Sequence, residues 1–146
     1  MSGTMPDELS HEYECVRAFH LKFGLPLPDT PQPLTHHDAM YRLYFLHEEL
    51  NETLLAYSQQ NMEKFFDGLL DLVYVAIGTA IWAGLPWKEG WDAVHQANMM
   101  KIRVKQYDQS KRKSHWDIVK PHGWKAPDLL PILRKAGWNP QTRGEA

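Results

Sequence analysis

Apolar residues recur at helical spacing along most of the first hundred positions, and no segment alternates apolar and polar residues for long enough to demand a sheet. The clearest stretch runs from about residue 36 to residue 57, where apolar residues follow one another at steps of three and four. These positions are Ala39, Leu43, Leu46, Leu50 and Leu54. We therefore expect an all-α fold, a bundle of four main helices, in which this amphipathic stretch is the second helix.

The first helix is predicted from about Pro6 to Phe23, because acidic residues stand in its first turn and Gly24 follows its last residue. Residues 25–33 contain prolines so densely that they cannot be helical, so they should form an extended connector. The apolar face of the first helix would carry Val16, Phe19, His20 and Phe23.

Polar capping residues mark where the next two helices begin. Thr35 followed by Asp38 resembles a capping box at the start of the second helix. Residues 58–61 should form a short turn, in which Asn61 can cap a third helix that ends near Ala83. Because this third helix is apolar on almost every side, we expect it to be the most buried element.

A fourth helix begins at Pro86, and the helical bundle is predicted to cover about residues 6–101. Beyond it, residues 102–146 are predicted to form a basic, irregular flap with a short helical turn near residues 128–134 and a frayed end. The chain, residues 1–146, is long enough for a single domain with its own core.

Charge is spread unevenly, although the net charge is only −2. Residues 1–100 contain 5 Lys and Arg against 14 Asp and Glu, whereas residues 101–146 contain 11 against 4. This asymmetry indicates either a tail that binds nucleic acid or two halves that meet around an anionic ligand and its metal ions. A single cysteine, Cys15, excludes an internal disulfide, and we expect a cytoplasmic protein without a secretory signal.

Two aspartates interrupt the most apolar segment of the chain, FFDGLLDLVYVAIGTAI at residues 65–81. An ionised carboxylate is very costly to bury, so Asp67 and Asp71 need a partner, a proton or a metal ion. Two acids near one end of the segment also disfavour a membrane-spanning helix, so we expect no membrane partner.

The second helix supplies further carboxylates, because the sequence HEELNE places Glu48, Glu49 and Glu52 within two turns. If the second and third helices pack antiparallel, the two acidic groups lie opposite one another and repel unless cations bind. Oxygen ligands favour hard cations, so the pattern predicts Mg²⁺ or Mn²⁺. The three glutamates alone would indicate a solvated helix face, and the aspartates in the apolar segment favour the metal site.

These acidic patterns resemble those of the all-α nucleoside triphosphate pyrophosphatases, the MazG-like superfamily. EELNE matches the EExxE pattern of that superfamily. DGLLD departs from its ExxD pattern, because position 68 is Gly68 and the acid stands one residue earlier. FGLPLPDTP, GLPW, VHQANMMK and KPHGWKAPDLLPIL are similar to a subgroup frequent in bacteriophages, so the resemblance covers about residues 15–134. It implies hydrolysis of a nucleoside triphosphate between its α- and β-phosphates, which yields the monophosphate and pyrophosphate.

The resemblance also implies roles for individual residues. The metal ligands would be Glu48, Glu49, Glu52, Asp67 and Asp71. The catalytic residues would be Glu48 and Glu49, and Glu48 is either a ligand or the carboxylate that accepts the proton of the attacking water. The residues that bind substrate would be Asn98, Lys101, His95 and Lys120. Lys101 alone would equally indicate an exposed lysine at a helix end, and His95 a histidine packed between helices.

Similarity to the bacteriophage subgroup favours purine deoxynucleotides such as dGTP or dATP as substrates. We expect a homodimer or homotetramer and no stable nucleic-acid partner. The main alternative is a non-enzymatic helical protein that binds nucleic acid or a protein partner through its basic tail. A ferritin-like di-iron centre is disfavoured because it needs two Glu-x-x-His motifs, whereas only Asp92-x-x-His95 comes near.

Overall fold

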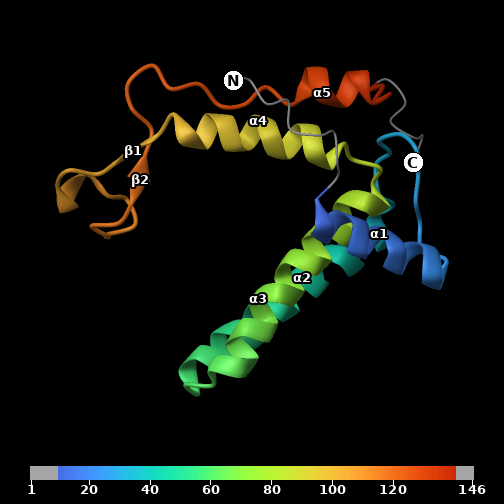
Figure 1. Ribbon diagram of the computed structural model, residues 1–146, viewed down its shortest axis with the longest axis horizontal. Helices are drawn as coiled ribbons and strands as arrows, with labels where there is room; N and C mark the ends of the chain where they lie inside the picture. Colours follow the sequence, from blue (N-terminus) through green and yellow to red (C-terminus); the bar gives the residue numbers. More distant parts are fainter. Residues whose placement is uncertain (1–9, 141–146) are drawn as a thin grey trace. The chain divides into compact units, whose positions relative to one another are not determined.

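The computed structural model describes residues 10–140, and in this part of the chain the fold is all-α with four main helices and almost no strand, as predicted (Figure 1). The described chain divides into two compact units, residues 10–87 with 133–140, and residues 88–132. The prediction of a single domain stays a prediction. The elements are α1 (His11–Phe23), α2 (His36–Ser58), α3 (Met62–Trp82), α4 (Trp87–Met99), β1 (Ile102–Arg103), a short 3₁₀ helix (Tyr107–Gln109), β2 (Ile118–Val119) and α5 (Leu130–Lys135).

Helices α2 and α3 form a long antiparallel hairpin in the first unit (Figure 1). The hydroxyl oxygen of Thr35 accepts a hydrogen bond from the backbone N–H of Asp38 and caps α2, as the sequence predicts. The side chain of Asn61 caps α3 in the same way. Between the helices, Gln60 adopts a left-handed conformation with φ of 54°, which lets the chain reverse within a few residues.

Helix α1 completes the core of the first unit by packing against α3. Its N-terminal cap is Ser10, so the predicted helical residues before that position lie outside the described residues. A small core joins Val16 of α1 to Ile77 and Ile81 of α3, and Trp87 packs against it. The prediction for α1 is half correct, because Val16 and His20 are buried whereas Phe19 and Phe23 are exposed.

The apolar stripe that identifies α2 in the sequence is largely exposed. Leu43, Leu50 and Leu54 are exposed, whereas the buried positions of α2 are Arg42, Thr53 and Ala56. The two helices therefore meet through small and polar side chains, which allow a closer approach than leucines would.

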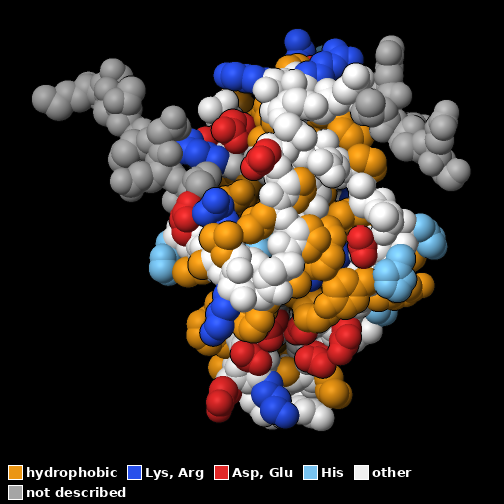
Figure 2. All heavy atoms as spheres, turned by 90° about the vertical axis from the view of Figure 1, so that its right-hand side faces the viewer, with side chains coloured by type: hydrophobic (Ala, Val, Ile, Leu, Met, Phe, Trp, Pro, Cys, Tyr) orange, Lys and Arg blue, Asp and Glu red, His pale blue; other side chains and the backbone are white. Residues whose placement is uncertain are grey.

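Helix α3 is less buried than predicted, because only one side of it contacts the rest of its unit. Its buried residues lie mainly in the C-terminal half, where α1 also packs, and are Gly68, Val75, Ile77, Gly78, Ala80 and Ile81. The length and composition of α3 would allow it to cross a membrane, but the core helix of a soluble protein can have the same length and composition. Exposed apolar residues on both helices leave the hairpin with uncovered hydrophobic surface, visible in Figure 2.

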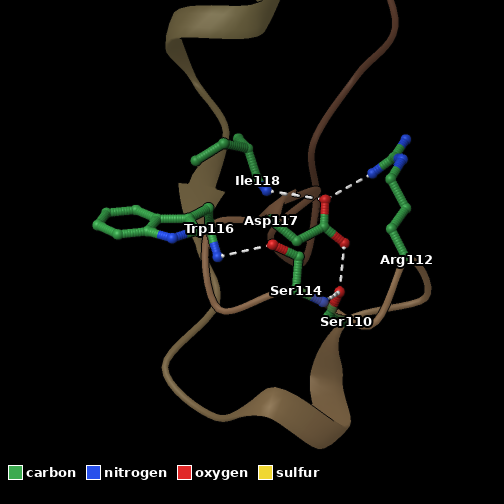
Figure 3. A network of polar contacts seen from close by, with 6 residues as sticks. All are labelled: Ser110, Arg112, Ser114, Trp116, Asp117 and Ile118. Atoms are coloured by element: carbon green, nitrogen blue, oxygen red, sulfur yellow. Dashed lines mark hydrogen bonds and ion pairs between the residues drawn. The ribbon is translucent and has the colours of Figure 1, made fainter. Parts of the chain in front are cut away.

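The second unit contains most of α4 and residues 102–132 of the segment predicted as an irregular flap, which includes two short strands. Ile102 pairs with Val119 and Arg103 with Ile118 in a short antiparallel ladder. The loop between the strands is held by the carboxylate of Asp117, which accepts hydrogen bonds from Ser110, Arg112 and the backbone of Ile118 (Figure 3). The predicted helical turn near residues 128–134 is present as α5.

Candidate active site

The five carboxylates predicted to bind metal lie together near the turn of the α2–α3 hairpin. Figure 2 shows acidic side chains gathered toward its lower end, which corresponds to the turn end of the hairpin in Figure 1. The pKa of Glu49 is raised above its ordinary value, first by burial of its side chain and then by the negative charges around it. Those charges belong to Asp71, Glu52, Glu48 and Asp67, in decreasing order of effect.

Glu49 and Asp71 form the inner part of this acidic cluster. The Oε2 atom of Glu49 is buried and has no hydrogen-bond partner among residues 10–140. Burial and the charge of Asp67 raise the pKa of Asp71. Glu48, Glu52 and Asp67 are exposed. Glu49 therefore lacks, at this oxygen, the donor that a buried anion normally requires.

As the side chains stand, no group of three or more His, Cys, Asp or Glu within residues 10–140 is arranged to hold a metal ion. The chemistry of the donor set nevertheless fits a hard divalent cation, because the ligands are carboxylate oxygens and one of them is buried without a donor. Glu49, Glu52 and Asp71 are the residues that would hold such an ion, with Asp67 and Glu48 beside them.

Gly68, which stands where the superfamily pattern has its acid, is packed closely against Thr53 of α2. A Cβ atom at position 68 would lie 2.2 Å from Oγ1 of Thr53 and 3.3 Å from the Cα of Thr53. The Thr53 hydroxyl donates a hydrogen bond of 2.7 Å to the backbone carbonyl of Glu49. The hairpin is thus closely packed at Gly68, and a side chain at position 68 has no space unless Thr53 moves.

A pocket of about 360 Å³ opens beside the acidic cluster. Its lining combines the carboxylates of Glu52 and Asp67 with the amide of Gln59 and the ammonium group of Lys64. Gln59 and Lys64 stand on opposite sides of the turn between α2 and α3, so only the folded hairpin brings them together.

Further along the hairpin, Arg42 ties α2 to α3, a contact that sequence analysis missed. This buried guanidinium donates hydrogen bonds to the carbonyl of Val75 at 3.0 Å and to the hydroxyl of Thr79 at 3.1 Å. Both acceptors are neutral, and burial lowers the pKa of Arg42. Arg42 stands two helical turns before Glu49, so it helps to fix the position of the acidic cluster along the hairpin. A lone arginine within the apolar run MYRLYFL was the available signal.

Two of the predicted substrate-binding lysines come together in the second unit. The Nζ atoms of Lys101 and Lys120 lie 5.1 and 4.9 Å from the ring centroid of Trp124. The indole N–H of Trp124 donates a 2.8 Å hydrogen bond to the carbonyl of Ala97, which fixes the ring against α4. Asn98 and His95 are exposed on α4. The role of these four residues in binding substrate stays a prediction.

Residues 16–98 match the phosphoribosyl-ATP pyrophosphohydrolase family. This match spans more than half of the chain. The chain belongs to this family. The family lies within the MazG-like all-α superfamily, which confirms the resemblance drawn from the acidic patterns, and it makes the chain a pyrophosphohydrolase that acts on nucleotides.

The matched segment contains the whole hairpin with its acidic cluster, and it ends before the second unit's strands. Lys101 and Lys120 therefore lie outside it. No curated protein matches the chain.

Proposed function

We propose that this family member hydrolyses a nucleoside triphosphate between its α- and β-phosphates, using Mg²⁺ or Mn²⁺, and releases the nucleoside monophosphate and pyrophosphate. The observation that supports the proposal most is the buried Oε2 atom of Glu49, which has no donor in the described part of the chain and is surrounded by further carboxylates. Carboxylates this close together repel one another unless a cation binds between them, and a divalent cation at this place would also attract phosphate oxygens.

Each residue has a task that follows from its position. Glu49, Glu52 and Asp71 would bind the metal ion, which when bound would neutralise charge on the phosphate oxygens and lower the pKa of a coordinated water. Glu48 is exposed and adjacent to Glu49, so it can accept the proton of the attacking water. Asp67 lines the pocket beside the cluster and would be an outer ligand.

For the substrate we propose a purine deoxynucleotide, dGTP or dATP, which rests on the similarity of several segments to the bacteriophage subgroup. Phosphoribosyl-ATP, the substrate in the family's name, is the second candidate, because the family match covers the acidic cluster. Both substrates would be cleaved at the same kind of phosphoric anhydride bond.

We further propose that the protein is a cytoplasmic homodimer or homotetramer. The exposed stripe of Leu43, Leu50 and Leu54 supports assembly, because a second copy would remove this surface from water. Light scattering coupled to size-exclusion chromatography would give the mass in solution. A strictly monomeric mass at high protein concentration would contradict the proposal.

The test is pyrophosphate release from the common ribo- and deoxyribonucleoside triphosphates and phosphoribosyl-ATP, each with Mg²⁺, with Mn²⁺ or with EDTA. We expect metal-dependent release of pyrophosphate and an equal amount of monophosphate, fastest for a purine deoxynucleotide. Asp71→Asn should remove the activity, and Asp92→Asn, an exposed aspartate of α4, is the matched control. Hydrolysis that persists in EDTA would overturn the proposed metal dependence. Hydrolysis of pyrimidine nucleotides alone would overturn the proposed purine substrate.

A further inference from the structure

The segment of residues 101–125, here called the basic ribbon, concentrates positive charge, and apart from the predicted substrate-binding residues Lys101 and Lys120 the proposed reaction does not account for it. It contains eight Lys and Arg against two Asp. One of these two, Asp117, is buried, and hydrogen bonds from Ser110 and Arg112 lower its pKa, so its charge is satisfied inside the ribbon. The surface of the ribbon is therefore strongly cationic.

An exposed tryptophan stands on this cationic surface and is held in place. The side chain of Trp116 is 76% exposed, and its backbone N–H donates a hydrogen bond to the hydroxyl of Ser114. The guanidinium carbon of Arg103 lies 4.3 Å from the ring centroid, and Arg103 is itself fixed by a 3.2 Å hydrogen bond to the carbonyl of His115. Figure 3 shows the indole pointing away from the Asp117 network. The rest of the indole surface is left open to solvent.

A pair of neighbouring rings also lies on the ribbon. Tyr107 is 45% exposed, and its ring centroid lies 4.9 Å from that of His115, the residue next to Trp116. Flat, exposed π-surfaces flanked by Lys and Arg are the combination that binds unpaired bases and the phosphates between them.

We propose that the basic ribbon binds single-stranded nucleic acid, with a base stacked on the open face of Trp116 and phosphates bound by the surrounding cations. Lys105, Lys111 and Lys113 are exposed and would supply phosphate contacts. This inference goes beyond the proposed hydrolysis and does not depend on it.

An anionic membrane is the main competing partner, and the register of the ribbon disfavours it. Ile102 is paired with Val119, whereas Ile118 is paired with Arg103. Because paired residues share a face and successive residues alternate, the two exposed isoleucines lie on opposite faces of the ribbon. The two isoleucines therefore do not share the single apolar face that insertion into a bilayer needs.

The test is fluorescence anisotropy of labelled oligo(dT) and oligo(U) titrated with the full chain in EDTA. Trp116→Ala should weaken binding by about five- to a hundredfold, the usual effect of losing one stacked base. Trp91→Ala is the matched control, because Trp91 is also exposed, at 61%, but lies on α4 outside the ribbon. Trp116→Phe keeps an aromatic face and should retain most of the affinity.

A salt titration separates the phosphate contacts from stacking. Replacing Lys105, Lys111 and Lys113 with Gln should reduce the slope of log affinity against log salt by about 0.7 for each lost phosphate contact. Circular dichroism shows whether each variant folds. If Trp116→Ala does not fold, the lysine variants decide the matter, because a salt slope equal to that of wild type would overturn the proposal. Equal affinities of Trp116→Ala and Trp91→Ala would overturn the proposal. Binding to phosphatidylserine vesicles but not to oligonucleotides would overturn it in favour of a membrane.

Discussion

The close contact between Gly68 and Thr53 gives the sharpest test of how the hairpin is built. Replacing Gly68 with Ala adds one methyl group whose carbon would lie 2.2 Å from Oγ1, 3.1 Å from Cβ and 3.3 Å from Cα of Thr53. The hydroxyl can move only by losing its 2.7 Å hydrogen bond to the carbonyl of Glu49, and the Cα atom belongs to the backbone of α2. The methyl group therefore forces α2 and α3 apart beside the acidic cluster.

The size of the effect follows from opposing contributions. Overpacking of a tight contact costs about 1–3 kcal/mol, and loss of the Thr53 hydrogen bond adds about 0.5–1.5 kcal/mol. Alanine is a better helix former than glycine and offsets about 1 kcal/mol. We expect Gly68→Ala to lower the free energy of unfolding by about 0.5–3.5 kcal/mol.

Urea unfolding followed by circular dichroism measures this change, and two further variants make the result specific. Gly90→Ala in α4 is the matched control, because a Cβ there has nothing within 4 Å, and it should raise stability by up to about 1 kcal/mol. Thr53→Ala removes the clashing hydroxyl, so Gly68→Ala should cost less in that background by about 1–2 kcal/mol.

The packing argument would be refuted if the Gly68→Ala variant were as stable as wild type. It would also be refuted if Gly68→Ala lowered the free energy of unfolding equally in wild type and in the Thr53→Ala background. Gly68→Glu, which recreates the superfamily's ExxD spacing, should destabilise the protein at least as much as Gly68→Ala because it has the same Cβ. A stable and active Gly68→Glu variant would show that space is not the reason for the displaced acid.

Two further predictions concern titratable groups. Asp71→Asn should abolish pyrophosphate release while leaving the free energy of unfolding unchanged or higher by about 0.2–0.5 kcal/mol, because it removes a repelling charge; Asp67→Asn should reduce the rate less, and the reverse order would contradict the inner position of Asp71. Burial lowers the pKa of His20 below 6.5. Between 6.5 and this lower folded-state pKa, the unfolded chain binds a proton that the folded chain does not bind. The free energy of unfolding should therefore fall as the pH drops through this window. Urea midpoints of wild type and His20→Asn across this window test it, with His47→Asn as the exposed control, and parallel curves for wild type and His20→Asn would contradict it.

The sequence by itself determined the elements, because their signals are local. Thr35 and Asn61 cap their helices within a single turn, and Gly24 ends α1 in the left-handed conformation that its missing side chain permits. The acidic residues could likewise be assigned to one region, because helical spacing and a short turn leave few ways to arrange two antiparallel helices. The all-α class needed nothing beyond these patterns.

Only the tertiary structure decided which side of α2 is covered. Periodicity locates an apolar stripe, but it cannot show whether another element packs on it, and here α3 packs on Arg42, Thr53 and Ala56. The contact depends on Thr53 fitting into the space left by Gly68, a match between residues far apart in the chain. The orphaned oxygen of Glu49 follows from the same packing, because burial of one atom is a property of the neighbours that surround it, and no local pattern records them.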